Sequence, residues 1–257
     1  MEDSFLLFLL VGFMAQIVDG ALGMAYGVVS STVMLSFGVP PAVASATVHG
    51  AEVFTTAASA GSHVWHRNVD WRMFRRLAPA GIAGGLIGTY ALTSFDASVL
   101  KPVVVAYLGF MGLYILYRAW HAPERYHDHS TAGLAALGGT GGFMDAVGGG
   151  GWGPVVTTGL IGSGGAPRTV IGTVNTVEFF LTTAVSIGFL VALMTGHWDQ
   201  DKALADHAMA VAGLIVGGLI AAPMAGYVTK ALPHRFLMIA VGVLICALAI
   251  YQLSRLI

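Results

Sequence analysis

The sequence has little charge, one cysteine and none of the short motifs typical of soluble enzymes. Asp, Glu, Lys and Arg make up 10% of its 257 residues, whereas soluble domains usually carry about 25%. The net charge of −1 leaves no basic surface for nucleic acid. The single cysteine, Cys246, excludes an intramolecular disulfide. There is no H-E-x-x-H motif, no Walker A motif and no nucleotide-binding domain. We therefore expect no enzymatic activity, no bound metal and no cofactor.

The residues that are present favour a polytopic membrane protein. Hydrophobic residues make up 56% of the chain, and the mean hydropathy is +0.78. A spanning helix needs roughly 20 mostly apolar residues, and six segments meet this requirement: 41–60, 77–94, 99–119, 169–193, 208–228 and 235–254. The N-terminus has Glu2 and Asp3 in place of a basic stretch, which favours a first membrane segment over a signal peptide. We expect an all-α protein in the cell (inner) membrane that crosses it several times.

Two further apolar regions, 4–36 and 133–162, are interrupted by glycine-rich stretches. The first contains "DGALGMAYG" (19–27) and the second contains "DAVGGGGWGP" (145–154). A polar linker, "HAPERYHDHS" (121–130), separates the two halves of the chain. We therefore divide the chain into a first transmembrane repeat (1–120), the linker and a second transmembrane repeat (131–257).

An internal duplication relates the two halves. A shift of 126 positions aligns residues 19–58 with 145–184 without a gap, and 13 of these 40 pairs are identical. The aligned pairs with the most chemical content are Asp19/Asp145, Gly23/Gly149, Gly27/Gly153, Thr47/Thr173 and Glu52/Glu178, and Tyr26/Trp152 is an aromatic match. Each half is thus expected to contain one broken segment and three transmembrane helices.

Paired glycine breaks in matching positions are typical of the binding site of a secondary transporter. Irregular backbone is tolerated at membrane depth only where protein buries it or where it lines a cavity. The helix ends at such a break offer N–H groups to an anion. Close helix packing by the glycines Gly148, Gly149, Gly150 and Gly151 is the competing explanation.

Acidic residues inside apolar segments are the second notable feature. Glu52 and Glu178 lie within two expected helices, where a charge costs at least ~2.5 kcal/mol and normally faces a cavity or a partner. His49 and Asn175 lie three residues earlier on the same faces. Both acids are candidates for proton coupling, or else structural hydrogen-bond acceptors. Asp19 and Asp145 precede the breaks and could cap the half-helices or carry a proton.

Lys and Arg constrain the topology. If the broken segments are re-entrant, the repeats are inverted and nine Lys and Arg residues fall on one side against three on the other. If the broken segments cross fully, the repeats are parallel and the division is eight to four. The positive-inside rule slightly favours inverted repeats, with loop 66–76 and linker 121–130 in the cytoplasm.

The duplicated plan and its motifs resemble the TauE/SafE sulfite exporter family of membrane permeases. The similarity covers nearly the whole chain, and its most specific part is "GGFMDAVGGGGWGPVVTTGLI" (141–161), followed by "IGTVNTVEFF" (171–180) and preceded by the basic loop "HRNVDWR" (66–72). The resemblance implies movement of sulfite, sulfonates and other small organic anions. It implicates Gly148 to Gly151, Trp152, Gly153, Pro154, Thr173, Asn175 and Glu178, with Gly23, Tyr26, Gly27, Thr47, His49 and Glu52 as first-half counterparts.

We therefore predict a permease that moves a small sulfur-containing anion by alternating access. The breaks would supply backbone N–H donors, while Thr47, His49, Thr173 and Asn175 would supply side-chain hydrogen bonds. The predicted partners are the anion and the lipid bilayer, and the oligomeric state is not defined by the sequence. A cation or metal ion transporter, with Asp19, Asp145, Glu52 and Glu178 as oxygen ligands, is the first alternative. A membrane enzyme is the second.

Overall fold

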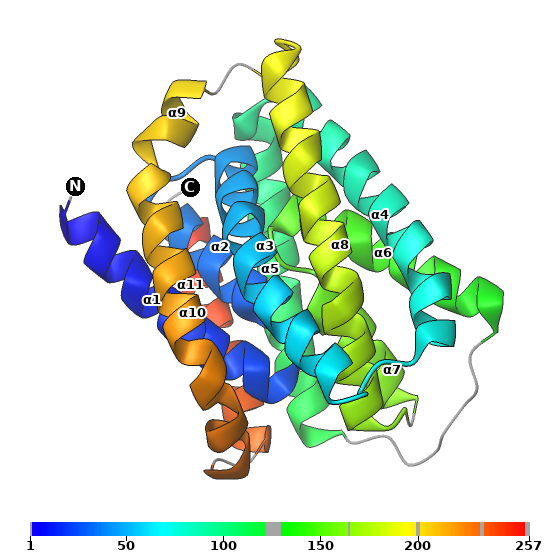
Figure 1. Ribbon diagram of the computed structural model, residues 1–257. Coiled ribbons are helices and arrows are strands. Elements are labelled where there is room, and N and C mark those ends of the chain that lie inside the picture. Colours follow the sequence, from blue (N-terminus) through cyan, green and yellow to red (C-terminus); the bar gives the residue numbers. More distant parts are fainter. Residues whose placement is uncertain (1, 122–129, 164, 199–200, 232–233, 255–257) are drawn as a thin grey trace.

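The computed structural model describes residues 2–121, 130–163, 165–198, 201–231 and 234–254. The first half contains α1 (Glu2–Leu22), α2 (Tyr26–Ser36), α3 (Pro41–Trp65), α4 (Trp71–Ser94) and α5 (Ala97–Trp120). The second contains α6 (Thr131–Gly148), η1 (Gly153–Thr157), α7 (Thr158–Gly162), α8 (Pro167–Met194), α9 (Asp201–Asp206), α10 (Ala208–Ala231) and α11 (His234–Leu253). These described residues include no strand, so the expected all-α fold is confirmed (Figure 1). Residues 122–129 of the expected linker lie outside the described residues.

Each half begins with a helix that stops at glycine and turns back. Phe8, near the start of α1, contacts Phe37, just beyond α2, with ring centroids 6.2 Å apart. The start of α1 and the end of α2 therefore lie at the same end of the molecule. In the second half, Gly159 of α7 packs beside Leu137 of α6 in the same way. We call these two units the helical hairpins, α1–α2 and α6–η1–α7.

The breaks in the hairpins are shorter than the sequence predicts. The expected irregular stretches began at Asp19 and Asp145, but α1 continues to Leu22 and α6 to Gly148. The reason is that the backbone carbonyls of both aspartates still accept hydrogen bonds from the N–H groups four residues later, as in any helix. The helices end where Gly23 and Gly149 adopt φ of +65° and +66°, a left-handed conformation that favours glycine.

The two halves interlock through close helix pairs. α4 packs along α6, and α1 packs along α10. A methyl group at Gly84 of α4 would overlap the carbonyl oxygen of Gly139 in α6, and one at Gly217 of α10 would overlap that of Leu9 in α1. Small residues therefore bring the backbones of these pairs together, as in many membrane helix interfaces. The first helix of each half is held by a helix of the other half.

The long helices α3 and α8 lie side by side in opposite directions (Figure 1). Asn68, just after α3, accepts a hydrogen bond from Arg168 in the first turn of α8. Nearer the other end of the pair, His49 of α3 lies 6.4 Å from Phe189 of α8 between ring centroids. α5 and α11 are also antiparallel, because Gly109 packs on Ala249 and Gly112 packs on Cys246. Each of these pairs joins matching helices of the two halves.

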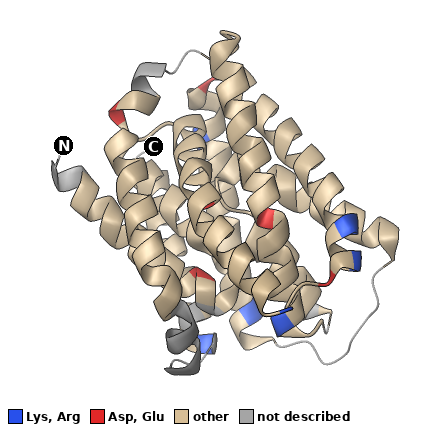
Figure 2. Ribbon diagram, in the orientation of Figure 1, with Lys and Arg blue, Asp and Glu red and all other residues tan. Residues whose placement is uncertain are grey.

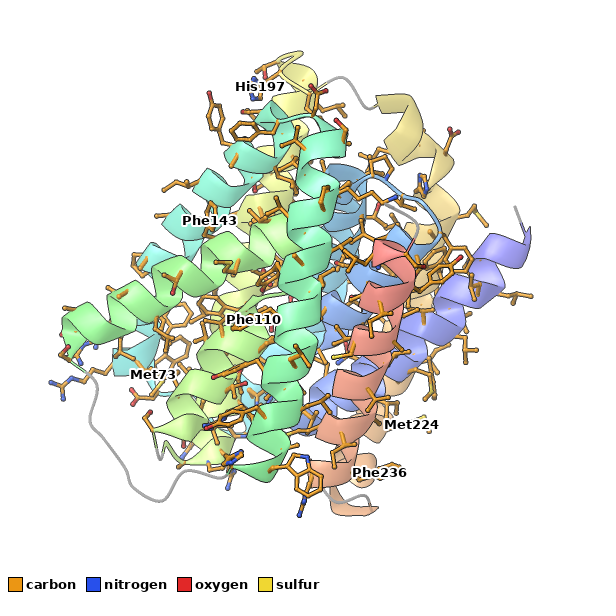
Figure 3. All side chains as sticks on the ribbon, turned by 180° about the vertical axis from the view of Figure 1, so that it is seen from behind. Met73, Phe110, Phe143, His197, Met224 and Phe236 are labelled. Carbon is orange, nitrogen blue, oxygen red and sulfur yellow. The ribbon has the colours of Figure 1, made fainter. Side chains whose placement is uncertain are left out.

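The molecule has apolar outer faces, and its interior combines an apolar core with buried polar groups. Large apolar side chains cover the outer faces of the helices (Figure 3), among them Ile87, Phe110 and Leu190, each more than half exposed. Conversely, four carboxylates and many Ser and Thr side chains are buried. By length and composition, Ala97–Trp120 and Pro167–Met194 could each cross a membrane, and four shorter apolar helical stretches accompany them. This distribution fits a protein surrounded by lipid.

Basic residues gather at one end of the bundle (Figure 2). We call this the basic end, and it holds loop 66–70, the start of α8 and the contact of Arg235 with the ring of Trp120. The opposite end holds the start of α3, the end of α8 and Lys101. No Lys or Arg occupies the middle of a described helix.

Candidate functional site

The two breaks have the same hydrogen-bonding pattern. Oδ1 of Asp145 accepts hydrogen bonds from the backbone N–H groups of Gly151 (2.8 Å) and Trp152 (2.9 Å). Oδ1 of Asp19 accepts one from the N–H of Tyr26, at 3.3 Å. Each aspartate thus reaches across its break and caps the returning half-helix from seven residues earlier. The capping role considered from the sequence is present at both positions.

Reciprocal contacts join the two breaks. The Ser31 hydroxyl in α2 donates to the Gly149 carbonyl at 2.5 Å, and the Thr157 hydroxyl in η1 donates to the Gly23 carbonyl at 2.9 Å. Ser31 and Thr157 are 126 positions apart, the same shift that aligns the halves. When residue i of one copy contacts j of the other and j contacts i in return, a two-fold relation is implied. The breaks therefore cross one another about a pseudo-two-fold axis.

Glycine is required where the breaks cross. A methyl group at Gly150 would overlap the backbone of Gly27 and Val28, and one at Gly153 would lie 2.6 Å from the Cα of Met24. Ala25 adopts φ of 112° in the first break, an unusual conformation for a residue with a side chain. Such strain is found preferentially at functional sites.

Four buried carboxylates surround the crossing. Asp19, Glu52, Asp145 and Glu178 are each at most 7% exposed. Glu52 interacts electrostatically with the other three. Its Oε1 lies beside Gly27 at the start of α2, and its Oε2 has no hydrogen-bond partner. Within the described residues the acids form one ion pair, between Asp145 and a histidine. The site therefore has an excess of negative charge when its acids are ionised.

That histidine is His49, which is fully buried on α3. Its Nε2 lies 3.1 Å from Oδ2 of Asp145, and its Nδ1 lies 2.8 Å from the carbonyl oxygen of Ser45. One donor atom each from His49, Glu52 and Asp145 lie within 4.8 Å of one another. Imidazole and carboxylate groups at this separation can hold a small cation between them.

The second half does not reproduce this arrangement. Asn175, the counterpart of His49, donates from Nδ2 to Ser59 at 3.1 Å, and its Oδ1 has no hydrogen-bond partner. Thr173 lies at the basic end, where its hydroxyl accepts a hydrogen bond from the N–H of Asp70 at 2.8 Å. Its counterpart Thr47 has a buried hydroxyl without a partner. Thr173 therefore lies away from the crossing, and Asn175 faces α3 rather than the aspartate of a break.

The matched aromatic residues anchor the half-helices to their surroundings. The Tyr26 hydroxyl donates to the carbonyl of Leu214 in α10 at 3.0 Å. The Trp152 ring N–H donates to the carbonyl of Val174 in α8 at 3.1 Å, and the Trp152 side chain is fully buried. Each aromatic ring thus fixes the beginning of a half-helix through its polar atom.

Sequence reasoning missed several residues of the site. Ser31 and Thr157 occupy aligned positions but are not identical, so a comparison that admits Ser/Thr exchange would have found them. Ser45 aligns with Ile171, and no signal in the sequence singles it out. The Tyr107 hydroxyl of α5, which is buried without a partner beside Gly151, is similarly unmarked.

Comparison with known proteins places the chain in a family. The family model described as "Sulfite exporter TauE/SafE" matches residues 8–252. The chain belongs to this family. Among curated proteins, the "Probable membrane transporter protein YtnM" of Bacillus subtilis (strain 168) is 39% identical to this chain over 248 residues. The match covers 92% of this chain and 78% of that relative. No solved structure matches the chain.

Family membership agrees with the architecture. A sulfite exporter TauE/SafE family member is a membrane transporter, and the apolar exterior and the buried glycine breaks are what such a protein requires. The resemblance drawn from "GGFMDAVGGGGWGPVVTTGLI" is therefore confirmed, as is the prediction of a helical membrane transporter.

Proposed function

We propose that the protein is a secondary transporter of small anions, with sulfite, sulfonates or related organosulfur anions as its substrates. The observation that carries this proposal is the crossing of two matched glycine breaks beside buried carboxylates and hydroxyls. Discontinuous helices that meet at a repeat interface commonly form the substrate site of secondary transporters. The family supports transport as the activity. In this proposal the substrate leaves chemically unchanged, so the protein is not an enzyme.

In this proposal the repeats are inverted in a multi-pass protein of the cell (inner) membrane. The opposite directions of the matched helices α3 and α8, and of α5 and α11, support an axis in the membrane plane. Both hairpins return to the end from which they start, which supports re-entrant segments. The positive-inside rule then assigns the basic end to the cytoplasm.

The two ends differ in a way that supports alternating access. At the basic end, Arg168 donates to Asn68 at 2.6 Å and the Asp70 N–H donates to Thr173, which ties loop 66–70 to α8. At the opposite end, a cavity of about 300 Å³ lies between the start of α3, the end of α4, the start of α5 and Trp198. A tethered loop at one end and a cavity at the other fit one of the two states that the mechanism needs.

An aromatic pair separates this cavity from the crossing. Trp198, which lines the cavity, lies 5.3 Å from Phe189 between ring centroids. Phe189 in turn lies 6.4 Å from His49. In this proposal the anion enters the cavity and passes this pair when it opens, and it reaches the hydroxyls of Thr47 and Tyr107, which have no partner now.

The buried acids impose a condition on anion binding. No Lys or Arg lies in the middle of a described helix to offset them, and like charges repel strongly in a medium of low dielectric constant. The anion can therefore bind near the crossing only when some of Asp19, Glu52, Asp145 and Glu178 carry protons. This supports proton coupling as the energy source of transport.

The convergence of His49, Glu52 and Asp145 also favours a second candidate, a cation transporter. The two candidates predict opposite ligands. The melting temperature of the purified protein is measured with sulfite, sulfate, thiosulfate or small sulfonates, and separately with a series of metal cations. If the main proposal holds, a sulfur anion should raise the melting temperature. Stabilisation by cations alone would favour the second candidate. Flux into proteoliposomes, with mass spectrometry of the product, then tests transport of an unaltered substrate.

Glu178 provides a direct test of the coupling role. Glu178→Gln keeps the shape of the side chain but removes its titration, so substrate binding should survive while flux driven by an imposed pH gradient falls. A Glu178→Gln protein with normal gradient-driven flux would exclude coupling at this position. Glu52→Gln asks the same question of the first half, and we expect unequal effects because His49 and Asn175 differ.

A further inference from the structure

His49, Glu52 and Asp145 form a buried group of metal-ligating side chains at the crossing. One ligand atom from each side chain lies within 4.8 Å of the other two, and none of the three residues is more than 2% exposed. An imidazole together with carboxylates suits divalent transition metals such as Zn²⁺ and Mn²⁺. Sequence motifs predicted no metal because His49 and Asp145 are 96 residues apart, in α3 and α6.

The ring of His49 is oriented as in a metal site. Its Nδ1 lies 2.8 Å from the carbonyl oxygen of Ser45, and its Nε2 faces Oδ2 of Asp145 at 3.1 Å. Metal-binding histidines commonly direct one ring nitrogen to a backbone carbonyl and the other to the ion. Two ligand atoms that share an ion are each about 2.0–2.2 Å from it, and so lie roughly 3.0–3.5 Å apart. Nε2 and Oδ2 therefore already have the separation that a shared ion needs.

Glu52 provides an independent sign of a missing ligand. Its Oε2 is buried and has no hydrogen-bond partner, whereas buried carboxylates are normally paired or bound to a metal. No Lys or Arg lies in the middle of a described helix to pair with it. A proton on Glu52 would remove the charge but would leave this oxygen without a partner. A divalent cation would contact the oxygen and also balance the charges of the Glu52 and Asp145 carboxylates.

We propose that His49, Glu52 and Asp145 hold a divalent metal ion that stays bound through the transport cycle, and that an open coordination position of this ion binds an oxygen of the transported anion. Three protein ligands leave the fourth position of a tetrahedral ion open. The Tyr107 hydroxyl, buried beside Gly151 without a partner, supplies a hydrogen bond to an anion held there. The metal site stands without the proposed function, whereas its role toward the anion rests on that function and deepens it.

The ion has two consequences at the crossing. It offers the anion a positive charge in a region where the described residues provide carboxylates and no Lys or Arg. It also links the two halves, because His49 and Glu52 belong to α3 whereas Asp145 belongs to α6. Release or rearrangement of the Asp145 ligand would therefore alter the contact between the halves.

The second half has no matching site. Asn175 replaces the imidazole of His49, and its amide nitrogen donates to Ser59. Within the described ranges, no second group of three His, Cys, Asp or Glu side chains converges in this way. Asp19 and Glu178 lie outside the ligand group, so Glu178 keeps the coupling role proposed above.

Metal titration of the purified full chain tests the site without any transport measurement. The protein carries no polyhistidine tag, is stripped with a chelator in detergent, and is titrated with Co²⁺ and then Zn²⁺. We expect a single bound Co²⁺ per chain, with the visible absorption of a low-coordinate ion, and its displacement by Zn²⁺. His49→Gln and Glu52→Gln should each bind at least about tenfold more weakly. Wild type that binds no more tightly than these two variants would overturn the proposal.

Glu178→Gln is the matched control, because it removes a buried carboxylate that is not in the ligand group. It should bind Co²⁺ as tightly as wild type. Exposed histidines in the loops bind metal to the same extent in every variant, so they do not affect the comparison. If His49→Gln does not fold, Glu52→Gln and Glu178→Gln decide the question, and equal binding by these two would overturn the proposal.

The role toward the anion is tested by the melting temperature with sulfite. We expect sulfite to stabilise the Zn²⁺-loaded wild type more than the stripped protein after the chelator has been removed. Equal stabilisation of the two forms would overturn this role. If no sulfur anion stabilises the loaded protein or crosses the membrane in proteoliposomes, the proposed function is rejected and the metal titration stands by itself.

Radioactive Zn²⁺ in proteoliposomes distinguishes an ion that stays bound from an ion that is transported. We expect the sulfur anion to cross while the Zn²⁺ remains with the protein. Flux of Zn²⁺ itself through the wild type would overturn the proposal and favour the cation transporter.

Discussion

Gly150→Ala tests whether the two breaks cross as closely as the structure shows. The added methyl group would overlap the backbone of Gly27 and Val28 in the other hairpin, which no side-chain rotation can relieve. Overpacking of this kind costs about 1–3 kcal/mol, and the φ of 155° adds roughly 1–2 kcal/mol of backbone strain for a residue with a Cβ. We therefore expect Gly150→Ala to lose about 2–5 kcal/mol of stability.

Gly50→Ala is the matched control. Gly50 lies in α3 between His49 and Glu52, yet a methyl group there would meet nothing within 4 Å, and alanine favours the helix by about 1 kcal/mol. Thermal unfolding of both variants in the same detergent measures the difference. For a chain of this size we expect Gly150→Ala to melt roughly 4–20 °C below wild type, and Gly50→Ala to melt no lower. A Gly150→Ala protein as stable as wild type would refute the crossing of the two backbones.

Three further predictions concern the symmetry, the topology and the closed end. Ser31→Ala and Thr157→Val should each cost about 0.5–1.5 kcal/mol in thermal unfolding, since each leaves one buried glycine carbonyl without its donor; a silent effect at one of the two would contradict the two-fold relation. Trp65→Cys in a Cys246→Ala background places a thiol at the exposed basic end, where an impermeant reagent should label it only after cells are permeabilised, and labelling of intact cells would reverse the topology. Arg168→Ala removes two of the hydrogen bonds that hold loop 66–70 and leaves the one from Asp70 to Thr173, so hydrogen–deuterium exchange should accelerate around His66 and Asn68, and unchanged exchange there would contradict a role of Arg168 in holding the loop.

The sequence predicted the breaks because the same residues recur at a constant spacing of 126 positions in the two halves. Asp19 and Asp145 are rare intramembrane acids at one constant spacing, and the structure gives them the same cap to Tyr26 and Trp152. The extent of each break was harder to predict. Glycine content suggested an irregular stretch from Asp19 onward, but a helix ends only where the backbone hydrogen bonds stop, which is at Gly23.

The asymmetry of the site was beyond the reach of the repeat pattern. The sequence places His49 three residues before Glu52 and Asn175 three residues before Glu178, which predicts matching faces. In the structure His49 contacts Asp145, whereas Asn175 contacts Ser59. Two differences separate the halves: an amide replaces the imidazole, and Ile171 replaces Ser45, whose hydroxyl lies 3.2 Å from His49 Nδ1 and donates to the Ala146 carbonyl. A long-range contact set by a residue without a counterpart leaves no signal in a comparison of the two halves.

The first helix of each half packs against a helix of the other half, α1 against α10 and α6 against α4. This packing has a consequence for the order in which the chain assembles. When α6 leaves the ribosome, its partner α4 has already been made. α1 must instead wait for α10, because Gly12 packs against the backbone of Leu214, about 200 residues later. At roughly 5–20 residues per second of synthesis, that interval is on the order of 10–40 s. α1 is the first helix to be synthesised, but it can make its native contacts with α10 only after most of the second half has been synthesised. The packing of the α1–α2 hairpin is therefore completed late.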